Sequence, residues 1–264
     1  MLERLRKRVA DARVRRRFAA HEAVGRTLVE RYGLRVRHGP FAGLELGEGV
    51  TARARAIGPK LLGTYESELE PFVEAAAADA FRTVVNVGAA EGYFAAGLAR
   101  RIGTARVVAF EMAAPMRSML AQTLRANGLE DRVEVRGECT PGELRAVADG
   151  ERCLVVIDCE GAELELMDPA AVPGLLRAAA IVELHDFIRP EISATLLGRF
   201  SATHDLAVVS QPPGRVPHRP ELDDLPPEHR PLAVDELRPA AMSWLVMAPH
   251  GATGPFADAV RAYG

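Results

Sequence analysis

The sequence predicts an α/β protein with a doubly wound, mostly parallel sheet of seven strands and a small N-terminal helical and β cap. Short runs rich in apolar and β-branched residues recur along the chain, and helical patterns separate most of them. Strands that alternate with helices imply a parallel sheet with helices on both faces. The expected strands span residues 83–87, 105–110, 132–136, 153–157, 178–184, 204–209 and 243–248.

The first expected strand leads into a turn that carries two glycines, Gly88 and Gly92, and then into an alanine-rich helix. Gly88 allows a sharp turn at the carboxyl end of the strand, and Gly92 allows the helix to pack close to the strand. The free N–H groups that open this helix face the crevice where α/β sheets hold their ligands. The segment therefore predicts the first βα unit of a Rossmann-like site for a nucleotide-type ligand.

An acidic residue stands at the end of the second expected strand. Glu111 follows Gly88 by 23 positions. A carboxylate about 20 positions beyond such a glycine turn commonly accepts hydrogen bonds from ribose hydroxyls. A solvated surface charge is the plain alternative. The preceding glycine turn favours the ribose interpretation.

Polar side chains follow the fourth and fifth expected strands. Asp158 and Glu160 come directly after the fourth, Glu183 lies inside the fifth, and His185 and Asp186 follow it. A charged Glu within an apolar strand is costly unless it is paired. Carboxylate and imidazole groups at adjoining strand ends can move protons or bind a metal ion, although a helix cap or a structural His-Asp pair is the simpler role.

Composition limits the classes of function. A chain of 264 residues with 48% hydrophobic content can form one large domain with a small appendage, and a net charge of -3 implies no general affinity for nucleic acid. Lysine occurs only as Lys7 and Lys60, which removes most lysine-based catalysis. Three cysteines without a C-x-x-C pair favour a reduced, cytoplasmic setting. No apolar run is long enough to predict integral membrane association.

We divide the chain into a basic N-terminal helix at 1–32, a cap at 33–75, a catalytic domain at 76–250 and a C-terminal tail at 251–264. The basic helix either lies on an anionic surface or packs on its own domain or a second subunit, and we favour packing, with a homo-oligomer as one form of it. In the cap, Tyr65 and Glu66 either fold over a ligand or form a simple capping turn. The proline-rich segment 211–241 predicts a loop or lid that selects substrate, with Arg238 as a candidate contact.

Three segments together resemble the class I S-adenosylmethionine-dependent methyltransferases, particularly the FkbM-type group. They are Val-Asn-Val-Gly-Ala-Ala-Glu-Gly-Tyr at 85–93, Val-Ala-Phe-Glu at 108–111 and Asp-Cys-Glu-Gly-Ala-Glu at 158–163, and Ile-Val-Glu-Leu-His at 181–185 extends the match. The resemblance covers roughly residues 64–186. Asn86 departs from it, because the family often has an acidic residue there. On this resemblance Gly88, Ala89 and Gly92 line the methionine part of the cofactor and Glu111 binds its ribose. Further cofactor-binding candidates from their positions are Glu91, Glu66, Asp158 and Glu138, with Cys139 as the alternative to Glu138.

The resemblance implies transfer of a methyl group from S-adenosylmethionine to a hydroxyl of a small molecule or sugar. Such a hydroxyl needs a base or a metal ion that lowers its pKa. His185, Asp158 and Asp186 are the catalytic candidates. The strand ends are also similar to those of metal-dependent catechol-type methyltransferases, so the same three residues are candidate ligands of Mg or Mn.

Other functions remain open. A nicotinamide-dependent oxidoreductase shares the glycine turn and the ribose acid, but no Tyr in this chain is followed four positions later by Lys. A nucleic-acid amino-methyltransferase would show Asn or Asp followed by Pro-Pro and an aromatic residue after the fourth strand, where this chain has Asp-Cys-Glu-Gly. A non-catalytic cofactor-binding protein would have no need of the acidic and histidine residues at the strand ends.

Overall fold

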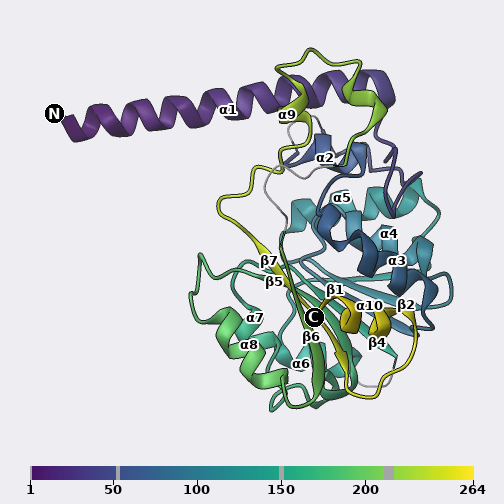
Figure 1. Ribbon diagram of the computed structural model, residues 1–264. Helices are drawn as coiled ribbons and strands as arrows, with labels where there is room; N and C mark the ends of the chain where they lie inside the picture. Colours follow the sequence, from purple (N-terminus) through teal and green to yellow (C-terminus); the bar gives the residue numbers. More distant parts are fainter. Residues whose placement is uncertain (1, 52–53, 149–151, 211–216) are drawn as a thin grey trace.

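The computed structural model describes residues 2–51, 54–148, 152–210 and 217–264, with side chains described from residue 17 onward. Its centre is a seven-stranded sheet of order β3-β2-β1-β4-β5-β7-β6 (Figure 1). The strands are β1 Thr83–Val87, β2 Arg106–Phe110, β3 Val133–Arg136, β4 Cys153–Ile157, β5 Ala179–Leu184, β6 His204–Ser210 and β7 Ser243–Pro249.

The sheet is mostly parallel, as the sequence predicts. β1 pairs in parallel with β2 and β4, and β5 pairs in parallel with β4. β7 is the exception, since it runs antiparallel to both β5 and β6. The crossover from β3 to β4, past β1, leaves the carboxyl ends of β1 and β4 side by side. Doubly wound sheets hold their ligands at such a point.

Register fixes which residues meet at this edge. Val87 at the end of β1 pairs with Phe110 of β2 and with Ile157 of β4. Ile157 in turn pairs with Val182 of β5. The next residues of these four strands are Gly88, Glu111, Asp158 and Glu183. These four residues therefore lie at one level of the sheet, and His185 follows two positions after Glu183.

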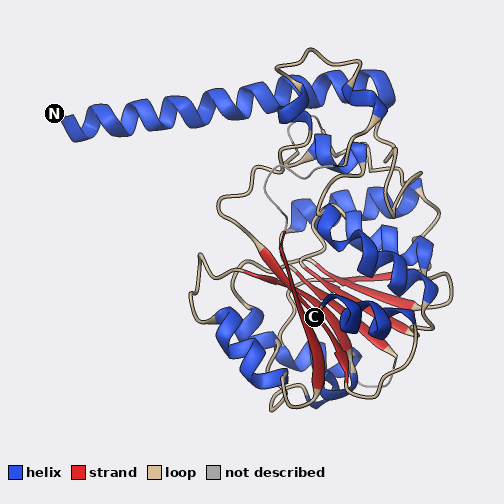
Figure 2. Cartoon of the chain, viewed as in Figure 1, coloured by secondary structure: helices blue, strands red, loops and turns tan. Residues whose placement is uncertain are grey.

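Helices cover both faces of the sheet (Figure 2). One core cluster joins β1 side chains such as Val84 to Phe72, Leu98, Leu120 and Phe256. These four lie on α3 Glu70–Ala78, α4 Tyr93–Arg101, α5 Ala114–Ala126 and α10 Pro255–Tyr263. A second cluster, which includes Val85, covers the opposite face with α6 Pro141–Val147, α7 Glu163–Leu166 and α8 Ile192–Phe200. Adjacent strand residues alternate between the two clusters, as a pleated strand buried on both faces requires.

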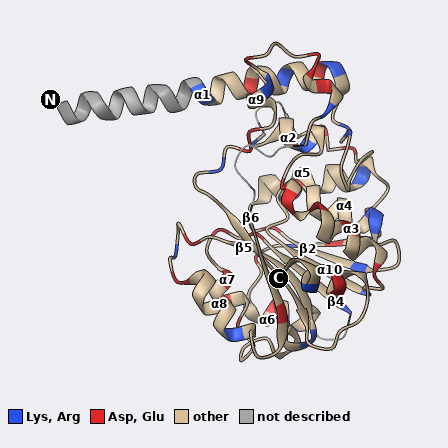
Figure 3. Cartoon of the chain, viewed as in Figure 1, with Lys and Arg blue, Asp and Glu red and all other residues tan. Residues whose placement is uncertain are grey.

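The N-terminal segment forms α1 Leu2–Tyr32, which projects beyond the rest of the molecule at its N-terminal end (Figure 1). Its C-terminal part packs on the protein through Val24 and Leu28, which are buried. Lysine, arginine and acidic residues are interspersed along the described chain (Figure 3). Between residues 33 and 64 the described β structure is one bridge, between Arg35 and Glu45. The helix α2 Ile57–Leu62 follows, and then the 3-10 turn η1 Ser67–Leu69. The β part of the expected cap is therefore a single pairing in the described residues.

The expected lid begins with residues 211–216, which lie outside the described part of the chain. The remainder forms η3 Pro220–Leu222 and α9 Arg230–Ala233, and it packs on the N-terminal segment, where Glu221 accepts hydrogen bonds from Arg37 and His38. The segment 251–264, expected as a tail, contains α10, because Phe256, Ala257 and Val260 form an apolar face that is buried. Among the described helices, none has the length and apolar character needed to cross a membrane.

Candidate functional site

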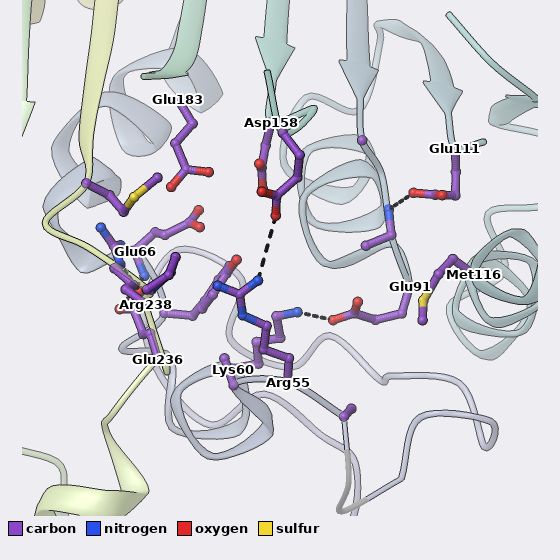
Figure 4. Close-up of a pocket in the computed structure, with 18 of the residues that line it drawn as sticks. Arg55, Lys60, Glu66, Glu91, Glu111, Met116, Asp158, Glu183, Glu236 and Arg238 are labelled. Atoms are coloured by element: carbon purple, nitrogen blue, oxygen red, sulfur yellow. Dashed lines mark hydrogen bonds and ion pairs between the residues drawn. The ribbon is translucent and has the colours of Figure 1, made fainter. Parts of the chain in front are cut away.

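A cavity of about 570 Å³ opens at the carboxyl edge of the sheet. Its walls come from the turns after β1, β2, β4 and β5, from the cap and from the segment before β7 (Figure 4). Its lining includes Arg55, Lys60, Tyr65, Glu66, Gly88, Ala90, Glu91, Glu111, Met116, Met119, Asp158, Glu160, Glu183, His185, Glu236, Arg238 and Met242. The cavity thus joins the glycine turn to the His-carboxylate group.

Gly88 is required by the turn after β1. Its φ is +79°, and a Cβ at this position would lie 1.6 Å from the carbonyl oxygen of Asp158. Gly92 has φ +99°, and a Cβ there would lie 2.7 Å from Leu120 on α5. The close neighbour of Gly92 is therefore a helix and not the strand that the sequence predicted. Ala90 lines the cavity, whereas Ala89 does not belong to its lining.

Glu111 lies at the predicted place for a ribose acid, and it is buried. Its Oε2 accepts a hydrogen bond of 2.9 Å from the Ala90 amide, and its Oε1 accepts one of 2.7 Å from the Ala113 amide. A carboxylate has about four lone-pair sites, so each oxygen keeps acceptor capacity toward the cavity. Met116 and Met119 line the same end. The amides hold the carboxylate in place without using its whole capacity.

A buried ion pair joins the cap to the glycine turn. Lys60 on α2 donates a hydrogen bond to Glu91, each residue is 7% exposed, and the Lys60 ammonium lies 4.7 Å from the centre of the Tyr65 ring. Sequence reasoning set lysine aside and missed Lys60. The available signal was its position inside the otherwise uncharged segment Ile57–Leu62, because a lysine is rarely buried without a partner.

The second focus of the cavity is His185, which is 2% exposed and held by Glu163. Its Nδ1 lies 2.7 Å from Glu163 Oε1, while its Nε2 lies 3.6 Å from Asp158 and 3.4 Å from Glu183. Glu160 is also 3.6 Å from Nε2. A carboxylate on one ring nitrogen fixes the orientation of the imidazole. The other nitrogen is thereby directed at the cavity carboxyls.

Burial and neighbouring charges shift the pKa values of Glu183 and His185. Burial, then the charge of Asp158 and a hydrogen bond with it, raise the pKa of Glu183 far above its usual range. For His185, burial opposes the charged form, but the hydrogen bond and charge of Glu163 and then the charges of Asp158 and Glu160 outweigh it and raise the pKa. Glu183 therefore favours its protonated form near neutral pH, and the titration of His185 is shifted to higher pH than that of a free imidazole.

The structure brings together two of the three predicted catalytic residues, Asp158 and His185, and adds Glu183. One ligand atom from each of these three side chains lies within 4.8 Å of the others. Asp186 points elsewhere, since its carboxylate accepts hydrogen bonds from the backbone amide and the hydroxyl of Ser193 at the start of α8. Glu138 is exposed after β3 and does not line the cavity.

The cap and the segment before β7 supply the remaining wall. Glu236 Oε1 accepts a 3.0 Å hydrogen bond from the Glu66 amide, and Glu236 Oε2 accepts one of 2.6 Å from Arg238 Nε. Arg238 Nη2 also donates to Glu68 at 2.7 Å. Glu66 and Arg238 lie on the β5 side of the cavity, across from Glu111 (Figure 4). Glu66 thus lines the same cavity as the glycine turn, on the side away from Glu111, and its assignment to the cofactor stays a prediction.

Backbone strain is concentrated at this cavity. Four of the six non-glycine residues with positive φ in the described chain line it: Ala56, Glu66, Ala90 and Glu160. Left-handed conformations of such residues cost of order 1–3 kcal/mol and persist where the surroundings enforce them. Their gathering around one cavity is typical of a functional site.

Comparisons with known proteins give no matching family model and no matching curated protein. Several solved structures are similar. An rRNA methylase from Streptococcus thermophilus is 14% identical over 70% of this chain and 96% of its own, with a TM-score of 0.47. An O-methyltransferase from Bacillus cereus in complex with SAH is 15% identical over 67% of this chain and 78% of its own, with a TM-score of 0.47. The cofactor-bound protein Rv0187 from MTB is 22% identical over 53% of this chain and 71% of its own, with a TM-score of 0.44. At these values the likeness bears on neither substrate nor reaction, and the fold assignment stands on the strand order itself.

Proposed function

We propose that the protein is an S-adenosylmethionine-dependent methyltransferase of the FkbM type that methylates a hydroxyl of a small molecule or sugar. The observation that carries this proposal is one cavity that contains both required parts. At one end are the glycine turn and Glu111, which suit an adenosine and its ribose. At the other end are Asp158, Glu183 and His185, which suit the handling of a proton or a metal.

The cofactor end supplies contacts of distinct kinds. Glu111 keeps acceptor capacity for ribose hydroxyls, and the thioether side chains of Met116 and Met119 give an apolar surface for an adenine ring. The Glu91 carboxylate, although paired with Lys60, lies beside the turn where the amino acid part of the cofactor would bind. Asp158 and Glu160 line the same cavity, and their carboxyls would supply negative charge to a bound sulfonium. Asn86, by contrast, is buried in β1, donates to Val156 and does not line the cavity.

In the reaction, the protein must align the acceptor oxygen with the methyl group and remove its proton. His185 is suited to the second task. Its Nδ1 is held by Glu163, and its Nε2 faces the cavity, where it can accept a proton from a hydroxyl. Since the pKa of His185 is raised, the neutral base becomes available only as the pH rises through that pKa. Activity is therefore expected to increase toward alkaline pH.

A divalent ion is the second candidate for the same task. The spacing of the ligand atoms of Asp158, Glu183 and His185 favours it, and carboxylate with imidazole ligands suits Mg or Mn. Glu183 takes the place that the sequence gave to Asp186, whose oxygens are engaged by Ser193. Such an ion would lower the pKa of the acceptor hydroxyl. In this case Glu183 and His185 would bind in their deprotonated forms.

Calorimetric titration tests the proposal. We expect S-adenosylmethionine and its demethylated product to bind with micromolar affinity and NADH not to bind. If a metal takes part, Mn²⁺ binds wild type and Asp186→Asn equally and binds Glu183→Gln at least tenfold more weakly. If His185 acts alone, Mn²⁺ does not bind at all. Binding of NADH in place of both methyl-cofactor forms would return the oxidoreductase alternative.

Association of two copies through α1 also stays a proposal. The described part of α1 leaves Phe18 54% exposed on a helix that projects from the body of the molecule (Figure 1). Light scattering of the full chain and of Phe18→Ser would test it, because loss of a dimer in the variant is expected only if this face forms the contact.

A further inference from the structure

The two ends of the cavity differ in chemistry, and the end opposite the cofactor end defines the acceptor. In Figure 4, Glu91, Glu111 and Met116 lie on one side of Asp158, whereas Glu66, Glu183, Glu236 and Arg238 lie on the other. A cofactor on the glycine turn covers β1 and β2, so the side toward β5 and β7 remains for the acceptor. The class of acceptor inferred from this side rests on the proposed methyl transfer.

Each lysine and arginine among the described residues that line the cavity already has a carboxylate partner. Arg238 already donates to Glu236 and Glu68. Lys60 is bound to Glu91, and Arg55 lies 3.7 Å from Glu160. Glu66 and Glu183 add two further carboxyl groups to this side of the cavity. A phosphate or carboxylate on the acceptor would therefore add negative charge to a site whose arginine and lysine charges are already balanced by carboxylates, which is unfavourable in a partly buried site.

Hydrogen-bonding capacity nevertheless remains unused here. Glu66 is 4% exposed and borders the cavity, but its Oε2 has no hydrogen-bond partner within the described structure. Arg238 Nη1 is likewise buried and without a partner there. Buried polar atoms are normally satisfied, and leaving one unsatisfied destabilises the protein. The terminal torsion of Glu66 is broad, so a small rotation presents its Oε2 to a ligand, whereas the two hydrogen bonds of Arg238 fix the plane of its guanidinium beside the cavity.

An open acceptor and an open donor on neighbouring side chains suit one kind of functional group. A hydroxyl both donates and accepts, so it can donate to Glu66 while it accepts from Arg238. An aromatic acceptor without further hydroxyls would leave both atoms unsatisfied. We propose that the acceptor is an uncharged, polyhydroxylated molecule of the sugar type, whose neighbouring hydroxyls bind Glu66 and Arg238 while another hydroxyl faces His185.

The test uses the full chain saturated with S-adenosylhomocysteine and ligand-observed saturation-transfer NMR. The probes are methyl α-D-glucopyranoside, methyl α-L-rhamnopyranoside, glucose 6-phosphate and phenol, an aromatic molecule with a single hydroxyl. We expect signal for at least one uncharged glycoside and none for glucose 6-phosphate or phenol. Titration of the bound glycoside should show roughly tenfold or greater weakening in Glu66→Gln and in Arg238→Gln, since each leaves a buried partner unpaired. The affinity for S-adenosylhomocysteine should change by less than about twofold, as expected for residues outside its contacts.

Controls and contrary outcomes separate this inference from the proposed function. Glu134→Gln, on the exposed side chain that pairs with Arg106 outside the cavity, should leave glycoside binding unchanged. Preference for the phosphorylated or aromatic probe, absence of glycoside binding, or binding unaffected by the two cavity substitutions would each overturn the inference while cofactor binding persists. Failure of S-adenosylhomocysteine itself to bind would instead overturn the proposed function. The wild-type probe measurement decides the matter even where a variant does not fold.

Discussion

The contact between Glu163 and His185 gives a prediction that needs no known substrate. Replacing Glu163 with Gln keeps an oxygen that can accept from His185 Nδ1, 2.7 Å away, and removes the negative charge. The Glu163 carboxylate is fully buried, and among the described residues no lysine or arginine forms an ion pair with it. The substitution therefore isolates the effect of charge on the imidazole.

The expected magnitude follows from the geometry. An opposite charge within about 4–6 Å changes a pKa by roughly 1–3 units. The pKa of His185 should fall by that amount, because burial lowers it and the charge of Glu163 no longer opposes this effect. One unit corresponds to about 1.4 kcal/mol. In wild type the folded pKa lies above the unfolded value, so the contact stabilises the fold fully below the unfolded pKa and loses this effect as pH rises through the folded pKa.

Two assays test the expected fall in the pKa of His185 and the pH dependence of stability that follows from it. Histidine NMR titration of metal-free protein should show the lowered pKa in Glu163→Gln. Urea unfolding at pH 5 should show a loss of stability of about 1.4 kcal/mol for every tenfold weakening of proton binding to His185, with a smaller difference at pH 9. An unchanged pKa of His185, or a stability loss that is independent of pH, would refute the view that Glu163 charges and orients this ring.

Three further predictions concern the cofactor end. Gly88→Ala places a methyl group 1.6 Å from the Asp158 carbonyl at a φ of +79°, so we expect loss of cofactor binding and a large fall in melting temperature, measured by calorimetry. Lys60→Met leaves Glu91 buried without its cation and should cost about 3–5 kcal/mol in urea unfolding. Glu111→Gln should weaken S-adenosylhomocysteine binding roughly tenfold or more in calorimetric titration, because one of the oxygens available to ribose becomes a donor.

Each of these has its own control. Gly103→Ala adds a methyl group with no atom within 4 Å and should change neither property. The double variant Lys60→Met with Glu91→Leu removes both charges and should recover most of the lost stability, and failure to do so would contradict a charge effect. Glu138→Gln should leave cofactor affinity unchanged, because that side chain lies outside the cavity lining. An effect there equal to that of Glu111→Gln would show that the turn after β3 reaches the ligand.

The sheet was predictable because its strands are buried on both faces. β4 is entirely apolar, and such a run has few alternatives to a central parallel strand. Parallel topology then brings the ends of β1, β2 and β4 to one edge, so the neighbourhood of Gly88, Glu111 and Asp158 follows from the sequence. The antiparallel direction of β7 has no local signal and was left undefined.

Asp186 and Glu183 differ in the side of the chain on which they lie. Successive residues of a strand point to opposite sides, so Glu183 and His185, two positions apart, share a side. Asp186 follows on the other side and reaches Ser193 instead. The alternation was visible in the sequence, whereas the partner on α8 was not. The alternation of side chains along β5 would therefore have placed Glu183, and not Asp186, on the same side as His185.

The remaining wall of the site depends on contacts between distant parts of the chain. Glu236 binds the amide of Glu66, and Arg238 binds Glu68, across 170 positions in each case. The proline-rich composition around these residues predicted a loop but not where it packs. Lys60 was hidden for the same reason, since its burial depends on Glu91 in a different element.

The location of bound S-adenosylhomocysteine in a crystal of the full chain tests the central claim most directly. We predict one molecule in the cavity, with its ribose hydroxyls on Glu111 and its sulfur facing the side of Asp158 and His185. The space between Glu66 and Arg238 should stay open to an acceptor. A molecule bound elsewhere, or bound here with its sulfur turned away from His185, would contradict the account.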